Sequence, residues 1–108
     1  MSIREQREEV RVPITRRGLL GAPTASHPCL IQDLSSKGLL LMSTVKAQLG
    51  DQLALKCELY PERFLECKVE VRHIHDDCLG IMIVEVSDAS LALYRQFIDE
   101  HVSLKRFR

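Results

Sequence analysis

The fold is decided by a stretch of alternating residues that reads Phe-Leu-Glu-Cys-Lys-Val-Glu-Val-Arg, positions 64–72. Leu65, Cys67, Val69 and Val71 are apolar, and charged side chains stand between them. Successive side chains of a β-strand point to opposite faces, so a period of two is typical of a strand with one buried face and one wet face. The stretch therefore predicts a sheet that packs one face against a core.

Further strand signals lie on both sides of this stretch. The expected strands cover residues 10–15, 28–32, 38–42, 52–60, 64–75 and 78–86. Turn residues separate them, and the segment from Gly18 to Pro28 is expected to hold a loop or a bulged strand end. Six strands at such short spacing favour an antiparallel β-barrel over parallel strands with intervening helices.

The apolar pattern changes its period after residue 86. Ser87 or Asp88 can cap a helix start, and Leu91, Tyr94 and Ile98 follow at helical spacing. The pattern predicts a helix over about residues 88–102 that packs over the mouth or side of the barrel. We therefore expect a mainly β protein, a six-stranded antiparallel β-barrel with a C-terminal α-helix.

Size and composition narrow the classes of function. The 108 residues fit one domain, and 15 basic against 15 acidic side chains leave no global positive field for DNA or RNA. The chain has no Trp, two Tyr and three Phe, which leaves few aromatic rings for stacking bases. No apolar run approaches the roughly 18 residues of a membrane span, and the N-terminus lacks the apolar part of a secretory signal. We expect a cytoplasmic protein without a nucleic-acid partner.

Catalytic and metal sites are not indicated. The cysteines, Cys29, Cys57, Cys67 and Cys78, show no C-x-x-C spacing, and reduced cysteines that pack as small apolar side chains are the expectation in a cytosolic chain. His73, His75 and Cys78 lack the second ligand pair typical of zinc sites. No combination of nucleophile, base and acid has convincing spacing, so we expect neither an enzyme nor a metal or cofactor.

Two short motifs carry binding chemistry. Arg7 and Arg11 form R-x-x-x-R, and after 21 intervening residues Asp33, Ser35 and Gly38 form D-x-S-x-x-G. A guanidinium group matches a phosphate, or the O6/N7 edge of guanine, with two parallel hydrogen bonds. A carboxylate suits the N1–H and N2–H₂ donors of guanine, and a hydroxyl can donate or accept beside it. If Asp33 and Ser35 lie in a strand, they share one face.

Gly38 fits a position where the chain turns with φ above zero, or where the backbone must approach a ligand closely. Each motif also has an ordinary alternative. Taken separately, the arginines fit solvated charges beside Glu8 and Glu9, and the second motif fits a common turn between two strands.

Taken together, the two motifs in this order and at this spacing resemble the signature of PilZ domains, the bacterial receptors for cyclic di-GMP. The resemblance implies a flexible arginine-containing arm, residues 1–9, before a single barrel domain, residues 10–108. It implies that the ligand folds the arm onto the barrel and creates a surface for a partner protein of motility, pilus or exopolysaccharide machinery. The cyclic di-GMP ligands it implies are Arg7, Arg11, Asp33, Ser35 and Gly38.

The chain departs from the family pattern at one position. Many family members carry another Arg directly before R-x-x-x-R, where this chain has Gln6, with Arg4 further back. This departure leaves open whether one ligand or a stacked dimer binds, and it makes Arg4, Gln6 and Lys37 secondary candidates. The alternative function is a PilZ-like protein-interaction module that does not bind nucleotide.

Overall fold

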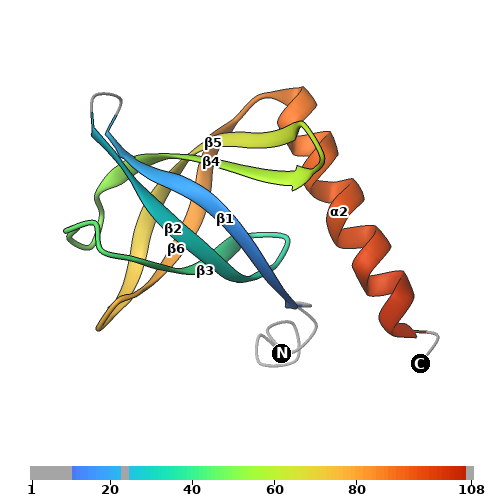
Figure 1. Ribbon diagram of the computed structural model, residues 1–108, viewed down its shortest axis with the longest axis horizontal. Helices are drawn as coiled ribbons and strands as arrows, with labels where there is room; N and C mark the ends of the chain where they lie inside the picture. Colours follow the sequence, from blue (N-terminus) through green and yellow to red (C-terminus); the bar gives the residue numbers. More distant parts are fainter. Residues whose placement is uncertain (1–10, 23–24, 107–108) are drawn as a thin grey trace, which may run out of the picture.

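The computed structural model describes residues 11–22 and 25–106, with side chains described as far as residue 101. Six strands and one helix follow in chain order (Figure 1): β1 Val12–Ala22, β2 Ala25–Leu34, β3 Gly38–Ser43, β4 Gln52–Tyr60, β5 Arg63–His75, β6 Cys78–Val86 and α2 Asp88–Arg106. The prediction of a six-stranded barrel followed by a helix is confirmed. The expected arm, residues 1–9, lies outside the described residues.

The strands form a closed antiparallel barrel with the neighbour order β1-β2-β3-β6-β5-β4. Closure comes from β4, which pairs back onto β1 over Gly18–Gly21 and Ala54–Cys57. A closed barrel has no unpaired edge, so the polar backbone groups along each strand are satisfied by neighbouring strands. Side chains of one parity along each strand therefore share a single enclosed core.

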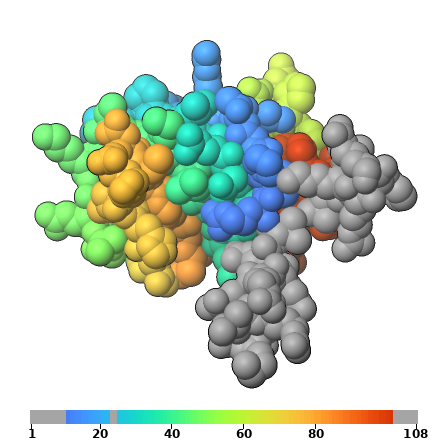
Figure 2. Space-filling model, turned by 90° about the horizontal axis from the view of Figure 1, so that it is seen from below, coloured from blue at the N-terminus to red at the C-terminus, as the bar shows by residue number. Residues whose placement is uncertain are grey.

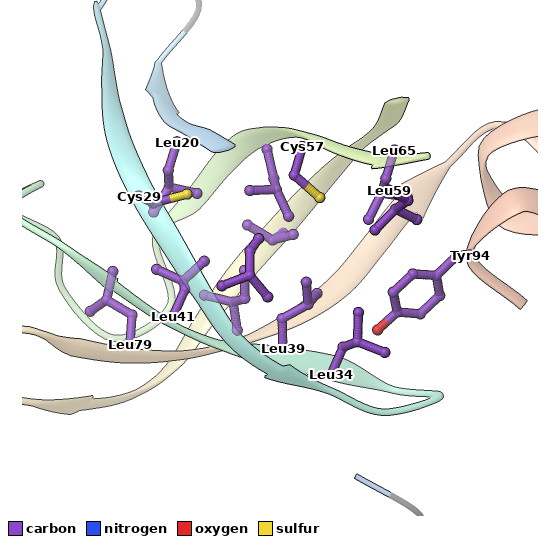
Figure 3. Packing of buried hydrophobic residues seen from close by; sticks show 14 of the residues in the cluster. Leu20, Cys29, Leu34, Leu39, Leu41, Cys57, Leu59, Leu65, Leu79 and Tyr94 are labelled. Carbon is purple, nitrogen blue, oxygen red and sulfur yellow. The ribbon is translucent and has the colours of Figure 1, made fainter. Parts of the chain in front are cut away.

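The core is built from aliphatic side chains of all six strands. Figure 3 shows these side chains converging inside the barrel, with Leu20, Leu41 and Leu65 among them. Cys57 is 1% exposed and packs in the same cluster, and all four cysteines are free thiols. The expectation that cysteines in alternating runs pack as small apolar side chains is thus confirmed for Cys57.

Helix α2 lies across one end of the barrel (Figure 1). Its Leu93, Tyr94 and Phe97 are buried against the strands. The Phe97 ring meets the Tyr60 ring edge to face at 5.6 Å between centroids, and the Arg16 guanidinium lies 5.4 Å from the Phe97 ring centroid. The helix covers the barrel mouth as expected and runs four residues beyond the expected end at 102, to Arg106. Within the described ranges, no helix has the length and apolar character needed to cross a membrane.

The first two strands are longer than the sequence pattern predicts. β1 continues to Ala22 and β2 begins at Ala25, so most of the expected loop between Gly18 and Pro28 is strand. A Cβ atom at Gly18 would lie 2.8 Å from the carbonyl oxygen of Lys56. Gly18 therefore serves close approach between β1 and β4, which is the other role of glycine inside a strand, and does not end β1.

Candidate functional site

Strand register brings the two motifs together at Arg11 and Asp33. Val12 pairs with Leu34 and Pro13 with Asp33, so the residue that precedes β1 lies beside the end of β2. The Arg11 guanidinium donates to one carboxylate oxygen of Asp33, with Nη2 at 2.7 Å and Nε at 3.1 Å from Oδ1. Residues that are 22 positions apart in sequence thus form one charged pair at the surface.

This ion pair is open to solvent. The Arg11 side chain is 49% exposed and the Asp33 side chain 21% exposed. Ion pairs of this exposure contribute at most about 1 kcal/mol to stability, because water screens both charges. The pair is therefore a weak structural bond, and its two charged groups can exchange partners with a ligand at low cost.

The rest of the second motif forms the turn between β2 and β3. The amide of Ser35 donates to the carbonyl oxygen of Gly38 at 2.8 Å, and the Ser35 hydroxyl oxygen lies 3.4 Å from the amide nitrogens of Lys37 and Gly38. Ser35 is 1% exposed, whereas Asp33 is half-buried. A shared strand face was expected only if both residues lay in a strand, and this condition is not met, because β2 ends at Leu34.

Two roles were expected for Gly38, a turn with positive φ or a close approach of the backbone to a ligand, and the structure contradicts the first. Its φ is not positive, since the described glycines with positive φ are Gly21 and Gly50. A Cβ atom at Gly38 would lie 2.1 Å from the carbonyl oxygen of Ile81 on β6. The structural requirement for glycine here is therefore close approach to the neighbouring strand at the start of β3, independent of any ligand.

Tyr94 of α2 completes the site and was not singled out from the sequence. Its hydroxyl oxygen lies 2.5 Å from the carbonyl oxygen of Ser35 and 3.1 Å from that of Gly38. Figure 3 shows the ring entering the barrel end, with the hydroxyl pointing toward the strand end that carries Leu34. Helical spacing predicted a core position for Tyr94, which is correct. The missed signal was the hydroxyl itself, since a buried tyrosine usually hydrogen-bonds its O–H.

The hydroxyl of Tyr94 is held in its neutral form. Burial is the largest cause that raises the pKa of this phenol, and the positive charge of Arg11 acts in the opposite direction. The pKa of Tyr94 is raised overall, so the phenol keeps its proton and remains a hydrogen-bond donor at neutral pH. Because the charge of Arg11 acts on the pKa of Tyr94, the ion pair and the buried phenol lie close to each other.

Two surface hollows flank the turn. One has a volume of 490 Å³ and is lined by Ser36, Lys37, Leu91 and residues 82–86 of β6. The other has a volume of 300 Å³ and lies between Ser36 and α2, beside Tyr94 and Arg95. Both volumes fall in or near the range of small-molecule sites. The exposed Lys37 adds a positive charge at the tip of the turn.

A hollow with a larger volume lies elsewhere on the described surface. It has a volume of 630 Å³, crosses β1, β4, β5 and β6, and contains none of the expected site residues. Figure 2 shows, on the face seen from below, that β1 lies between β2–β3 and the described part of α2. We favour the smaller hollows as the site, because Ser36 of the motif turn lines both of them and Lys37 lines the larger of the two. The binding chemistry of the lining residues is a better guide to a site than volume.

Three expected site residues, Arg7, Arg4 and Gln6, lie outside the described residues. The structure therefore brings together Arg11, Asp33, Ser35 and Gly38, and it places Lys37 at the tip of the same turn. In the part of the chain that the structure describes, no group of three or more His, Cys, Asp or Glu side chains is arranged to hold a metal ion.

Comparisons with known proteins agree with this geometry. The family model of the PilZ domain matches residues 5–100, a range that includes both motifs. No curated protein matches the chain. The Bacillus subtilis inhibitor of motility (MotI/DgrA) has a similar structure, with a TM-score of 0.74 and 20% identity over 91% of this chain. This chain spans about half of that protein, 52% of its length.

A second solved structure is similar over its whole length. The PilZ domain of CeSA from a cellulose-synthesizing bacterium has a TM-score of 0.65 and 11% identity, covering 89% of this chain and 98% of that domain. At such low identities the two structures establish a shared fold. The match to the family model over residues 5–100 is the stronger finding, because it covers most of the chain.

Proposed function

This chain belongs to the PilZ domain family, and we propose that it is a cyclic di-GMP receptor and adaptor that changes conformation when the nucleotide binds. The observation that supports this proposal most strongly is the Arg11–Asp33 pair, which joins the two halves of the signature at one place. Both groups are exposed enough to meet a ligand, and both have the chemistry that a guanine nucleotide needs.

The ligand offers two phosphates and two guanine edges. In the proposed complex, Arg11 binds a phosphate or the O6/N7 edge of a guanine through its planar donors. Asp33 accepts hydrogen bonds from the N1–H and N2–H₂ groups of a guanine. Ser35 shapes the turn through contacts with the amides of Lys37 and Gly38, so its contribution to binding is indirect.

The N-terminal residues supply the other half of the proposed site. Arg7 stands four positions before Arg11 and would add a second guanidinium, with Arg4, Gln6 and Lys37 as secondary contacts. Closure of this segment over the ligand would create a new surface, and ordering of a segment by a ligand is a common type of switch. The chain would then act as a binding module in the cytoplasm, without catalysis.

A protein of motility machinery is the partner we propose. The similar structure from Bacillus subtilis is named an inhibitor of motility, and this chain shares its fold over 91% of its own length. Pilus and exopolysaccharide machinery are the other candidate partner systems. The partner would recognise the surface formed by the bound nucleotide and the closed N-terminal segment.

Isothermal titration of the protein with cyclic di-GMP tests this function, with GTP as the control. We expect saturable binding of cyclic di-GMP and none of GTP at the same concentrations. The stoichiometry distinguishes one ligand per chain from a stacked dimer, which Gln6 leaves open. Absence of binding at tens of micromolar ligand would favour the alternative, an interaction module of the same fold that binds no nucleotide.

A further inference from the structure

The motif turn lacks a conformational feature that two other hairpin turns of the barrel possess. The turn between β4 and β5 contains Glu62 with φ of 63°, and the turn between β5 and β6 contains Asp76 with φ of 54°. Left-handed residues at such turns match the twist of the flanking strands. Among the described residues these are the two non-glycine positions with positive φ, so Ser36 and Lys37 have negative φ.

The motif turn is held from outside by α2 instead. Tyr94 contacts two carbonyl groups of the turn, at 2.5 Å to Ser35 and 3.1 Å to Gly38. These two carbonyls stand at the two ends of the turn, where β2 finishes and β3 begins. One phenol thus contacts both ends of the turn, in addition to the backbone hydrogen bond from the Ser35 amide to the Gly38 carbonyl.

Tyr94 is itself rigidly placed. It is 1% exposed, and its neighbours Leu93 and Phe97 on α2 are buried in the same core. A side chain that is packed on all sides has one rotamer available, so its hydroxyl stays at a fixed position relative to the barrel. The docking of α2 on the barrel mouth therefore contributes to the position of the turn.

We propose that Tyr94 is a positioning residue of the nucleotide site, which holds the 35–38 turn in its binding geometry through hydrogen bonds to the Ser35 and Gly38 carbonyls. This inference rests on the proposed function, since the binding geometry is that for cyclic di-GMP. A ligand that contacts Asp33 and the tip of the turn binds a structure that is already formed, and a preformed site loses less entropy on binding.

The contact also links the site to the helix in both directions. A ligand that prefers the held form of the turn must stabilise the docked position of α2 to the same degree, because coupling between two sites is reciprocal. Tyr94 is the described contact between α2 and the turn through which this coupling would run.

The matched pair of variants Tyr94→Phe and Tyr60→Phe tests the proposal. Each removes one hydroxyl that hydrogen-bonds at the interface between α2 and the barrel, since the Tyr60 hydroxyl donates to Glu100 at 2.5 Å. Only Tyr94 touches the motif turn, so Tyr60→Phe controls for weaker docking of the helix. Thermal unfolding of both variants confirms that each is folded before comparison.

Two measurements are made on each variant. Hydrogen exchange of the Lys37 and Gly38 amides, without ligand, reports the turn itself. We expect Tyr94→Phe to speed this exchange roughly 3- to 10-fold relative to Tyr60→Phe, as loss of a buried hydrogen bond would. Titration with cyclic di-GMP should show a similar loss of affinity for Tyr94→Phe, again relative to Tyr60→Phe.

The outcomes separate this proposal from the function on which it rests. If both variants exchange and bind alike, or if exchange is faster in Tyr94→Phe while affinity is unchanged, the positioning role is refuted. If the wild-type protein binds no cyclic di-GMP, the proposed function fails, and the exchange measurement alone decides whether Tyr94 holds the turn.

Discussion

Among the described residues Arg11 has one charged partner, and a second partner would compete with it in the proposed complex. Its guanidinium donates to Asp33 at 2.7 Å while half of its side chain remains exposed. Binding of a phosphate would replace or extend this pair, so the free energy gained is the difference between two charge-assisted contacts. The residue is therefore more important for the ligand than for the fold.

Substitution Arg11→Ala should separate these two contributions. We expect cyclic di-GMP binding to weaken by about 2–4 kcal/mol, roughly 30- to 700-fold, because a charge-assisted bidentate contact is lost. The free energy of unfolding should change by less than about 1 kcal/mol, since the ion pair is exposed. Titration calorimetry and urea unfolding measure the two quantities.

Arg17→Ala is the matched control for this substitution. Arg17 is an exposed arginine of β1, six positions along the chain and hence about 20 Å away. The control removes the same charge and should leave affinity nearly unchanged at physiological salt. Equal losses in the two variants would mean that Arg11 acts through net charge, and the assigned contact would be incorrect.

For individual residues, the sequence predicted positions better than roles. Arg11 and Asp33 meet as their motif chemistry requires. Ser35 and Gly38 lie in the turn between β2 and β3, but local spacing could not show that the hydroxyl would face the turn amides or that β6 would pass so close. Tyr94 reaches the turn from 56 residues away, a separation that no local pattern encodes.

Among the strands, the start of β3 depends on its neighbour β6. Gly38 pairs with Met82, and the carbonyl of Ile81 occupies the space that a side chain at Gly38 would need. A substitution of Gly38 that changes ligand binding would therefore also change the pairing of β3 with β6. The two effects can be separated by measuring stability in the absence of ligand.

Gly38→Ala should destabilise the ligand-free protein by about 1–3 kcal/mol, because a backbone atom of β6 must move to admit the methyl group. The comparison is Gly80→Ala, where the nearest atom is Cβ of the exposed His73 at 3.2 Å and a smaller cost is expected. Urea unfolding gives both values. A Gly38→Ala protein as stable as the wild type would show that the close approach to Ile81 does not restrict this position.

Strand boundaries could be predicted where alternation was unbroken. β4 and β6 have the expected bounds, and β5 starts one residue earlier than expected. β1 and β2 were underestimated because Arg16, Arg17 and Gly18 interrupt the apolar pattern. These three residues adopt the strand conformation because β1 pairs with β2 and β4. Such pairing is long-range information that a single segment of sequence does not carry.

Across the complete barrel, closure buries three of the four cysteine thiols. Cys29 and Cys57 lie in the enclosed core, and Cys67 packs against it. Burial raises the pKa of Cys29 to about 11, and it raises the pKa values of Cys57 and Cys67 to about 12. Since the thiolate is the reactive form, all three should be inert near neutral pH.

Thiol reactivity therefore measures barrel closure. At pH 8 the thiolate fraction of these three cysteines is roughly one part in a thousand or less, and it rises only as the pH approaches 11. We expect an aromatic disulfide reagent to modify Cys78 first, at the half-buried start of β6, and the other three only on unfolding in denaturant. Fast modification of three or four thiols in the native protein would contradict a closed barrel.

Titration of ¹⁵N-labelled protein with cyclic di-GMP, followed through its backbone amide resonances, tests both the ligand and the place where it binds. We expect saturable shifts of Arg11 and of the amides at 33–38, with smaller shifts where α2 meets the turn near Tyr94. Amides of the distant turn at Asp76 should not move. Shifts centred on the 630 Å³ hollow across β1, β4, β5 and β6, or no shifts at all, would contradict the assignment of this site.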